Sequence, residues 1–247
     1  MNNELRSFWK RNFQYGWKFG LLLILIVCIP RFYLVLRANQ TGSYGSIGLI
    51  MFLSALVPFI FLSKYGRKQI GIIQTKNFTW LLIAFAAGIG ASLLLYLAGK
   101  GLYGSGFQNW YVYIGKSYNI PENIGVQQKT IQFAVMAATG MTFSPIGEEL
   151  FFRGIVHGSF AKSLGDRKAS LADGSAFALT HLSHFGLVYV NMRWDFYPIP
   201  ALLWIISMFL VSFLFFKMKK KTRSVWGAVL CHAGFNLGMI FSIFFLL

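Results

Sequence analysis

The chain has 247 residues, of which 56% are apolar and only 12% are charged, and its mean hydropathy is +0.57. A soluble domain carries roughly 25% charged residues, so the composition excludes an ordinary soluble domain and favours a polytopic helical membrane protein of the all-α class. The net charge of +16 does not indicate nucleic-acid binding, because the bases lie between apolar runs and no recognisable nucleic-acid module is present. It indicates membrane topology and contact with anionic lipid in the bilayer.

The apolar runs predict about seven transmembrane helices. They cover 18–36, 45–62, 79–98, 131–161, 169–190, 199–217 and 225–247. Bases precede the first run as in a signal sequence, but no small-residue cleavage pattern follows it, so we interpret it as a retained span. Cys28 and Cys231 lie inside apolar runs without a CxxC pair, and we expect both to be small buried residues.

The distribution of lysine and arginine predicts the orientation in the cell membrane. If the N-terminus is cytoplasmic, 16 of the 23 bases fall in cytoplasmic segments, Lys76 among them. Six fall in outer segments, where we count Arg31, and Arg153 lies inside a span. The bias predicts a cytoplasmic N-terminus and an external C-terminus, because basic residues are retained on the cytoplasmic side.

The first three spans carry no conspicuous ionisable residue at mid-span, which predicts a scaffold function for them. We therefore divide the chain into an N-terminal transmembrane scaffold with an outer loop, residues 1–129, and a catalytic membrane domain, residues 130–247. The outer connection 99–130 carries Trp110, Tyr111 and Tyr113, and we expect these aromatic residues to form a belt at the membrane interface.

The fourth run contains the residues that are hardest to explain as structure alone. It is too long for one straight span, and Pro145 predicts a kink just before Glu148 and Glu149. Glu149 and Arg153 are four residues apart, so they share a helix face and can neutralise each other. Glu148 lies about 100° around the helix, and we expect it to be the carboxylate that remains available. Ionisable residues inside a membrane span are functional-site candidates.

Two later runs carry polar residues with helical spacing. Phe177 and His181 are one turn apart in the fifth span, and His232 and Asn236 are one turn apart in the seventh. Measured from the cytoplasmic ends at 1.5 Å per residue, His181, His232 and the glutamates lie roughly 18, 11 and 20 Å deep. Three helices thus bring these groups to similar depth. His184 is three residues from His181 and could line the same cavity, but it lies outside these patterns, so we interpret it, like His157, as a structural residue.

This set of residues suggests hydrolysis of a peptide bond. A carboxylate in a poorly solvated pocket can take a proton from water, and a neighbouring histidine can orient that water. A second histidine and an asparagine are donors suited to the oxyanion of a tetrahedral intermediate. The chain has no GxSxG serine motif in a suitable place and no HExxH zinc signature.

The ordered set Glu148-Glu149-x-x-x-Arg153, Phe177-x-x-x-His181 and His232-x-x-x-Asn236 resembles the three motifs of the CAAX-protease and bacteriocin-processing family. Its members are intramembrane glutamate-type endopeptidases related to the Ras-converting CAAX endopeptidase. The resemblance covers residues 130–240. It implies that Glu148 activates water and His181 helps to hold it, that Glu149 and Arg153 support the site, and that His232 and Asn236 form the oxyanion hole. We expect no cofactor, because the chain lacks a zinc signature and Asn236 is a poor zinc ligand but a good oxyanion donor.

Several alternatives stay open on the sequence. A non-catalytic immunity or binding protein could keep the same scaffold, and a zinc peptidase could use Glu148, His181 and His232 as ligands, so zinc is not excluded. A transporter is disfavoured because spans one to three lack a matching set of polar residues. The partners we expect are a peptide or protein substrate and the lipid bilayer. The sequence indicates neither the substrate's identity, nor the choice between processing and immunity, nor the oligomeric state.

Overall fold

The computed structural model describes residues 3–75, 77–118, 120–121 and 124–247, and these form a helical bundle. Lys76, counted above among the cytoplasmic bases, lies outside the described residues. The long helices are α1 (Trp17–Thr41), α2 (Gly45–Phe61), α4 (Phe78–Tyr103), α6 (Val126–Glu149), α8 (Asp166–Thr180), α9 (Pro198–Thr222) and α10 (Val225–Phe245). The short ones are α3 (Lys64–Gln69), α5 (Trp110–Lys116), α7 (His157–Leu164), the 3-10 helices Trp9–Arg11 and His181–Ser183, and the π-helix Leu150–Val156.

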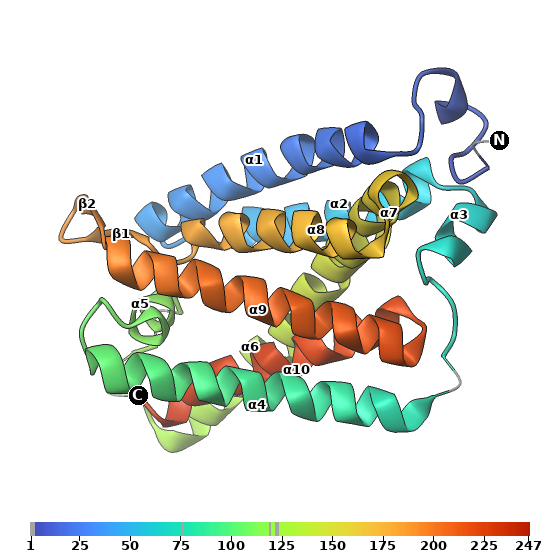
Figure 1. The fold of residues 1–247 in the computed structure, drawn as a ribbon. Coiled ribbons are helices and arrows are strands. Elements are labelled where there is room, and N and C mark those ends of the chain that lie inside the picture. The colour runs from blue at the N-terminus through green and yellow to red at the C-terminus, as the bar shows by residue number, and fades with distance from the viewer. Residues whose placement is uncertain (1–2, 76, 119, 122–123) are drawn as a thin grey trace.

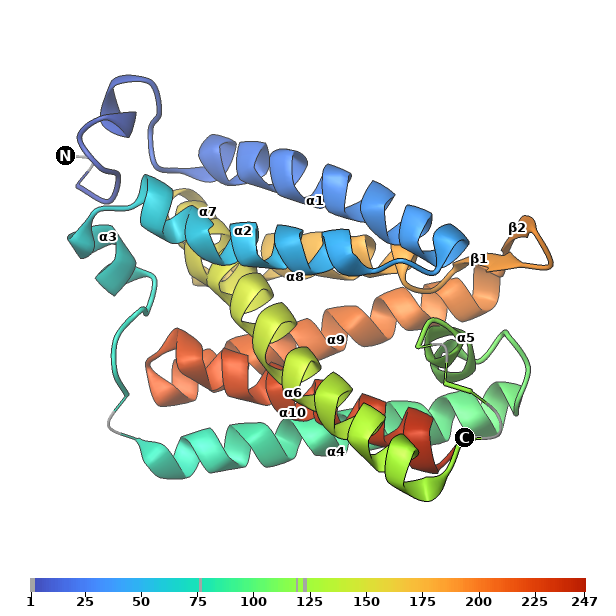
Figure 2. The same cartoon turned by 180° about the vertical axis from the view of Figure 1, so that it is seen from behind.

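The long helices lie roughly along a common axis, with α6 crossing the others obliquely (Figures 1 and 2). The N-terminus, α3 and α7 lie at one end of the bundle, whereas α5, the hairpin β1–β2 and the C-terminus lie at the other (Figure 1). The two termini are therefore on opposite ends, as an odd number of membrane crossings requires. α10 packs against α4, α6 and α9 and is the most buried of the long apolar helices, with 72% of its apolar window inside the protein.

The composition-based prediction of an all-α polytopic bundle is confirmed. In the described part of the chain, four helices are long and apolar enough to cross a membrane: α1, α4, α9 and α10. α2 is apolar but has 17 residues, and α8 has 15. At 1.5 Å per residue α8 is only about 22 Å long, which is short of a full hydrocarbon core. The count of seven spans stays a prediction.

The end of the predicted fifth span is not helical. The helix stops at Thr180, and Leu187–Val190 forms strand β1, paired antiparallel with β2 (Arg193–Phe196). Gly186 adopts a φ of +123°, and the turn residues Asn191 and Met192 have φ of 51° and 63°. Two consecutive residues with positive φ are typical of a tight hairpin turn, and the β-branched valines favour a strand over a helix.

The aromatic residues of the outer connection do not form an interfacial belt. Trp110, Tyr111 and Tyr113 are buried in α5, with exposed fractions of 1%, 0% and 5%. The Tyr111 hydroxyl lies 2.7 Å from Ser92 Oγ on α4, and the Trp110 ring stacks on Trp204 of α9 at a centroid distance of 6.0 Å. The prediction was wrong because these rings close the end of the bundle and bury more apolar area there than at a lipid surface.

Glycines allow α10 to approach α4 closely. A Cβ on Gly88 would lie 1.9 Å from the Cys231 carbonyl oxygen, and one on Gly234 would lie 2.1 Å from the Phe85 carbonyl oxygen. Small residues permit such backbone contact between membrane helices. Gly147 has the same function between α6 and α2, because its Cβ would lie 2.4 Å from the Met51 carbonyl oxygen. The helix segment that carries Glu148 is thereby held directly against α2.

Pro145 does not end the fourth element. α6 continues through it to Glu149, and the irregular segment is the π-helix Leu150–Val156 that follows, before α7 begins at His157. All seven residues of this π-helix are buried. A π-helix widens the turn by one residue and is frequent at functional sites. The element predicted at 131–161 is therefore an α-helix, a π-helix and a second α-helix in succession.

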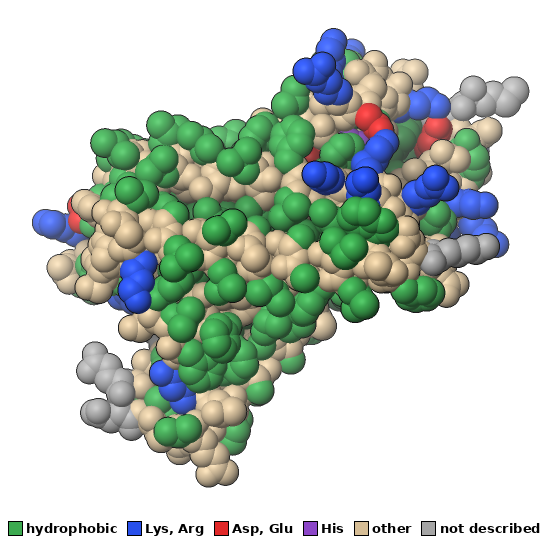
Figure 3. Space-filling view, turned by 60° about the horizontal axis from the view of Figure 1, so that its bottom comes forward, with side chains coloured by type: hydrophobic (Ala, Val, Ile, Leu, Met, Phe, Trp, Pro, Cys, Tyr) green, Lys and Arg blue, Asp and Glu red, His purple; other side chains and the backbone are tan. Residues whose placement is uncertain are grey.

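Side chains on the surface divide by type along the bundle axis. Apolar side chains cover its middle, and Lys and Arg side chains gather at one end, with a smaller group at the other (Figure 3). Cys28 and Cys231 are buried free thiols, as expected. An apolar middle region between charged ends is the surface expected of a protein that spans a bilayer.

We expect the end that carries the N-terminus to face the cytoplasm. Reporter domains inserted after Ser105 or between Asn191 and Met192, or fused to the C-terminus, should all read as external, and an N-terminal fusion should read as cytoplasmic, because the charge bias places the basic end inside. The connection between α4 and α5, the hairpin β1–β2 and the C-terminus, which carry these positions, lie at one end of the bundle (Figure 1). A cytoplasmic reading at the C-terminus together with an external reading at Ser105 would contradict both the orientation and the bundle.

Candidate active site

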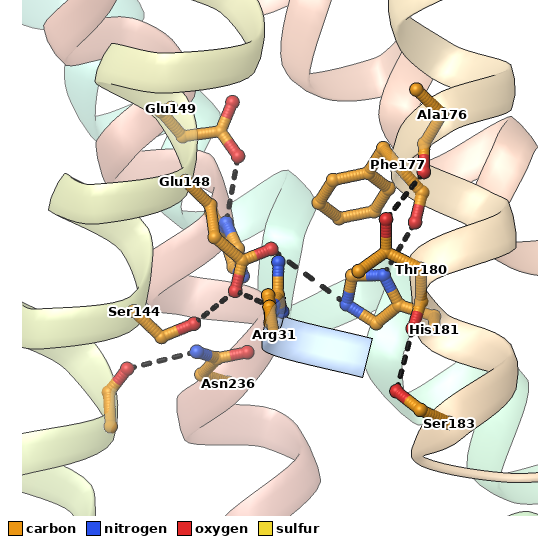
Figure 4. Close-up of polar contacts among 12 residues, drawn as sticks. Arg31, Ser144, Glu148, Glu149, Ala176, Phe177, Thr180, His181, Ser183 and Asn236 are labelled. Atoms are coloured by element: carbon orange, nitrogen blue, oxygen red, sulfur yellow. Dashed lines mark hydrogen bonds and ion pairs between the residues drawn. The ribbon is translucent and has the colours of Figure 1, made fainter. Parts of the chain in front are cut away.

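Glu148 lies at the C-terminal end of α6 and is almost completely buried, with an exposed fraction of 2%. Its Oε1 accepts hydrogen bonds from Arg31 Nη2 at 2.9 Å and from Ser144 Oγ at 2.6 Å. Within the described residues its Oε2 has no hydrogen-bond partner. Figure 4 shows Arg31 and His181 both directed toward this carboxylate. One oxygen of Glu148 is thus fixed, and the other is available.

Arg31 corrects two expectations from the sequence. It lies inside α1 rather than in an outer segment, its exposed fraction is 3%, and it forms an ion pair with Glu148. Glu148 is therefore not the unpaired member of the two glutamates, and the first three spans do supply an ionisable residue. The sequence did contain a signal for this pairing: Arg31 lies within an apolar run, and a buried base needs a buried acid to neutralise it. Ser144, one turn before Glu148, was also overlooked.

Glu149 and Arg153 form the expected ion pair. Arg153 Nε lies 3.2 Å from Glu149 Oε2, and both side chains are completely buried. The guanidinium carbon is 4.2 Å from the centre of the Phe177 ring and 5.3 Å from that of Phe215. A cation over two aromatic faces gains electrostatic stabilisation where water is absent. Phe177 of the FxxxH motif thus supports Arg153 as well as His181.

His181 is the first residue after α8, and its ring faces Glu148. His181 Nδ1 lies 2.7 Å from the Phe177 carbonyl oxygen, which can only accept, so Nδ1 carries the proton and donates. His181 Nε2 is 3.8 Å from Glu148 Oε2. That distance is too long for a direct hydrogen bond. In a neutral ring Nε2 has a lone pair, so two acceptors face each other across a space that a hydrogen-bond donor can enter.

His232 and Asn236 lie one turn apart on α10. His232 Nδ1 is 2.8 Å from Glu149 Oε1, and its ring stacks on Phe215 at a centroid distance of 4.7 Å. Asn236 Nδ2 donates to the Gly140 carbonyl oxygen on α6 at 2.8 Å. The structure therefore gives each glutamate its own histidine: Glu148 faces His181, and Glu149 binds His232.

These groups line one cavity of about 470 Å³ inside the bundle. Of the six residues singled out in the sequence, Glu148, His181, His232 and Asn236 line it, whereas Glu149 and Arg153 lie behind its wall. Arg31, Ser144 and His184 also line the cavity, together with methionine, isoleucine and aromatic side chains. A mostly apolar cavity with a few convergent polar groups is the usual form of a binding site.

The two remaining histidines differ in setting. His157 Nδ1 is 2.6 Å from Asp173 Oδ2 and its Nε2 is 3.4 Å from Asp166 Oδ1, at the end of the bundle away from the cavity. His184 lines the cavity, and its Nε2 has no partner among the described residues. Among the described residues, no group of three or more His, Cys, Asp or Glu side chains is arranged to hold a metal ion.

A family model described as Rce1-like, type II CAAX prenyl endopeptidase, matches residues 130–238. The match includes all three motifs, and Arg31 lies outside it. No curated protein and no solved structure matches the chain. This description agrees with the resemblance that the motifs suggest. Together, the family model and the apolar helices support a multi-pass membrane protein. Residues 130–238 of this membrane protein thus match an Rce1-like family model of the CAAX-protease type, the type that the motifs suggest.

Proposed function

We propose that this protein is an intramembrane endopeptidase in which Glu148 activates the water that attacks a peptide bond. The observation that carries the proposal is the pair of acceptors, Glu148 Oε2 and His181 Nε2, separated by 3.8 Å at the cavity wall. A water molecule between them donates one proton to each, which leaves an oxygen lone pair free for attack.

Arg31 keeps Glu148 in the ionised form that a base requires. Its guanidinium donates to Oε1 only, so it stabilises the negative charge without occupying Oε2. During attack, the water oxygen bonds to the substrate carbonyl carbon and a proton passes to Glu148. When the tetrahedral intermediate collapses, the C–N bond breaks and the same proton passes to the leaving amine.

The donors for the oxyanion lie on α10. His232 Nδ1 lies 2.8 Å from Glu149 Oε1, and the same carboxylate pairs with Arg153. The Asn236 amide has two protons, and the Gly140 carbonyl takes one. We propose that the second Asn236 proton, with His232 one turn away on the same helix, stabilises a tetrahedral oxyanion in a site of low polarity.

The substrate class we propose is a peptide with an apolar anchor, and the family description makes a prenylated CAAX peptide the first choice. A role in bacteriocin processing or self-immunity remains a second proposal. The decisive comparison uses a farnesylated CAAX peptide, the same peptide without the lipid, and an unrelated apolar peptide, each incubated with protein in detergent and analysed by mass spectrometry for the cleaved bond.

The two glutamates should respond differently to substitution. Glu148→Gln keeps size and polarity but removes the base, so cleavage should fall at least about a hundredfold while the melting temperature changes little. Glu149→Gln leaves Arg153 buried without its counter-charge, which costs roughly 3–5 kcal/mol, so the melting temperature should fall and cleavage should be lost with it.

Asp195→Asn on the exposed strand β2 is the matched control, because it removes one carboxylate outside the cavity. Cleavage by Glu148→Gln at the parent rate would end the enzyme assignment. A cellular phenotype that survives in Glu148→Gln would instead favour a non-catalytic binding or immunity protein.

Arg31 should matter for both stability and cleavage. Arg31→Met leaves Glu148 buried without its partner and should lower stability by roughly 3–5 kcal/mol; Arg31→Lys keeps the charge and should recover part of the loss. Arg37→Met, at an exposed position of the same helix, is the control. In the double variant Arg31→Met/Glu148→Gln no charge is left uncompensated, so stability should return while cleavage stays absent. If Arg31→Met cleaves like the parent at a temperature where both are folded, Arg31 is not needed for the base.

We expect cleavage to need no zinc. Arg31 Nη2 lies 2.9 Å from Glu148 Oε1, and His232 Nδ1 lies 2.8 Å from Glu149 Oε1, so two of the three residues of the zinc alternative each have one ring or carboxylate atom paired with a charged protein group. A guanidinium beside the carboxylate also repels a divalent cation. Elemental analysis of purified protein and cleavage assays after chelation provide the measurement. Stoichiometric zinc whose removal abolishes cleavage, and whose return restores it, would establish the zinc alternative.

A further inference from the structure

A second cavity, of about 640 Å³, lies at the end of the bundle that carries the N-terminus, away from the candidate active site. Its walls come from α3 and the residues that follow it, from α7, and from the C-terminal end of α9, with Glu4 and Tyr15 from the N-terminal segment. These elements connect or end the long helices, so the cavity lies where the bundle leaves the hydrocarbon core.

The lining of this cavity is strongly basic. Five of its side chains are bases: Lys68, Lys162, Lys219, Lys220 and Arg223. The carboxylates that line it are Glu4 and Asp166, which leaves an excess of three positive charges. The excess is local, and it lies within the larger group of basic side chains at one end of the molecule (Figure 3).

The two carboxylates are already neutralised by lysines. Lys162 Nζ donates to Glu4 Oε1 at 2.7 Å, and Lys220 Nζ donates to Asp166 Oδ2. His157, the remaining titratable group on α7 at the cavity, is held by Asp173 and Asp166. No carboxylate of the cavity is therefore left to neutralise the other three bases.

Those three bases differ in how they are held. Lys219 Nζ donates to the Arg153 carbonyl oxygen at the π-helix, and an ammonium has two further protons to donate. Lys68 and Arg223 have no hydrogen-bond or ion-pair partner for their side chains within the described part of the chain. An arginine and two lysines around one concave space match a phosphate group, which accepts bidentate bonds from a guanidinium and charge from ammonium groups.

We propose that this cavity binds a phosphate group, and that the ligand is the headgroup of an anionic phospholipid. The source is argued from position and size. The cavity opens at the ends of membrane helices, and 640 Å³ exceeds what a single phosphate fills. If the basic end is cytoplasmic, as the charge bias predicts, it also faces the leaflet that is rich in anionic lipid. A free phosphate compound is the other source of the same chemistry.

The test compares lipid binding by the parent and by two double variants in detergent. Lys68→Gln/Arg223→Gln removes the two unpaired bases of the cavity. Lys10→Gln/Lys64→Gln is the matched control, because it removes two exposed bases from the same end of the molecule that do not line the cavity. Native mass spectrometry with phosphatidylglycerol, phosphatidylcholine and inorganic phosphate gives the number bound, and thermal melting gives the affinity.

We expect the parent to retain one phosphatidylglycerol and to prefer it to phosphatidylcholine. The cavity variant should bind about 25-fold more weakly, about fivefold for each base removed, and the control should bind like the parent. Binding of lipid but not of inorganic phosphate identifies a headgroup, and binding of both identifies a phosphate site open to soluble ligands. Equal loss in the control, or no preference over phosphatidylcholine, would overturn the proposal. Peptide cleavage by the cavity variant tests the active site separately, because neither Lys68 nor Arg223 lines the catalytic cavity.

Discussion

The structure depends on the burial of two adjacent carboxylates in a bundle with few other acids. Glu148 and Glu149 have exposed fractions of 2% and 0%, and burying an unpaired charge costs several kcal/mol. Successive residues on a helix point about 100° apart, so one arginine cannot serve both. Arg153 neutralises Glu149 from within the same element, and Arg31 neutralises Glu148 from α1. Two separate ion pairs result, and each leaves its glutamate in a different chemical setting.

This requirement ties the N-terminal helices to the domain that the family model covers. Arg31 lies 117 residues before Glu148 in the chain and outside the matched range. The division at residues 129 and 130 remains our proposal for the domains, but the candidate site extends across it. A scaffold that only held the later helices in place would not need a buried arginine at this point, so α1 contributes the charge that neutralises Glu148 as well as packing contacts.

The later helices are fixed by close packing rather than by charge alone. α10 carries His232 and Asn236 and approaches α4 through glycines that leave no room for a Cβ. Arg153 is enclosed by the rings of Phe177 and Phe215, and Phe215 also stacks on His232. Because one aromatic set contacts both the arginine and the histidine, a shift of α8 or α9 would move the supports of both glutamates together.

The sequence determined the features that depend on composition and helical spacing. The charge deficit and the apolar runs predicted the all-α membrane bundle, and the four-residue spacing predicted the Glu149–Arg153 pair. The ordered motifs predicted the family through their resemblance to known sequences; helical spacing alone would not have identified it. These properties are local, since a hydrophobic run or an i, i+4 pair needs no partner from elsewhere in the chain.

Only the tertiary structure decided which groups meet from distant segments. Arg31 could not be assigned to Glu148, because a single base near the end of an apolar run fits an interfacial position equally well until α1 is placed beside α6. Trp110 and Tyr111 fit a membrane belt by composition, but their burial depends on the space left by α4 and α9. The strand Leu187–Val190 looks like an apolar continuation of a span in the sequence, but α8 already ends at Thr180, and Gly186, with its positive φ, directly precedes the strand. In each case the deciding energy comes from long-range burial, which helical periodicity does not encode.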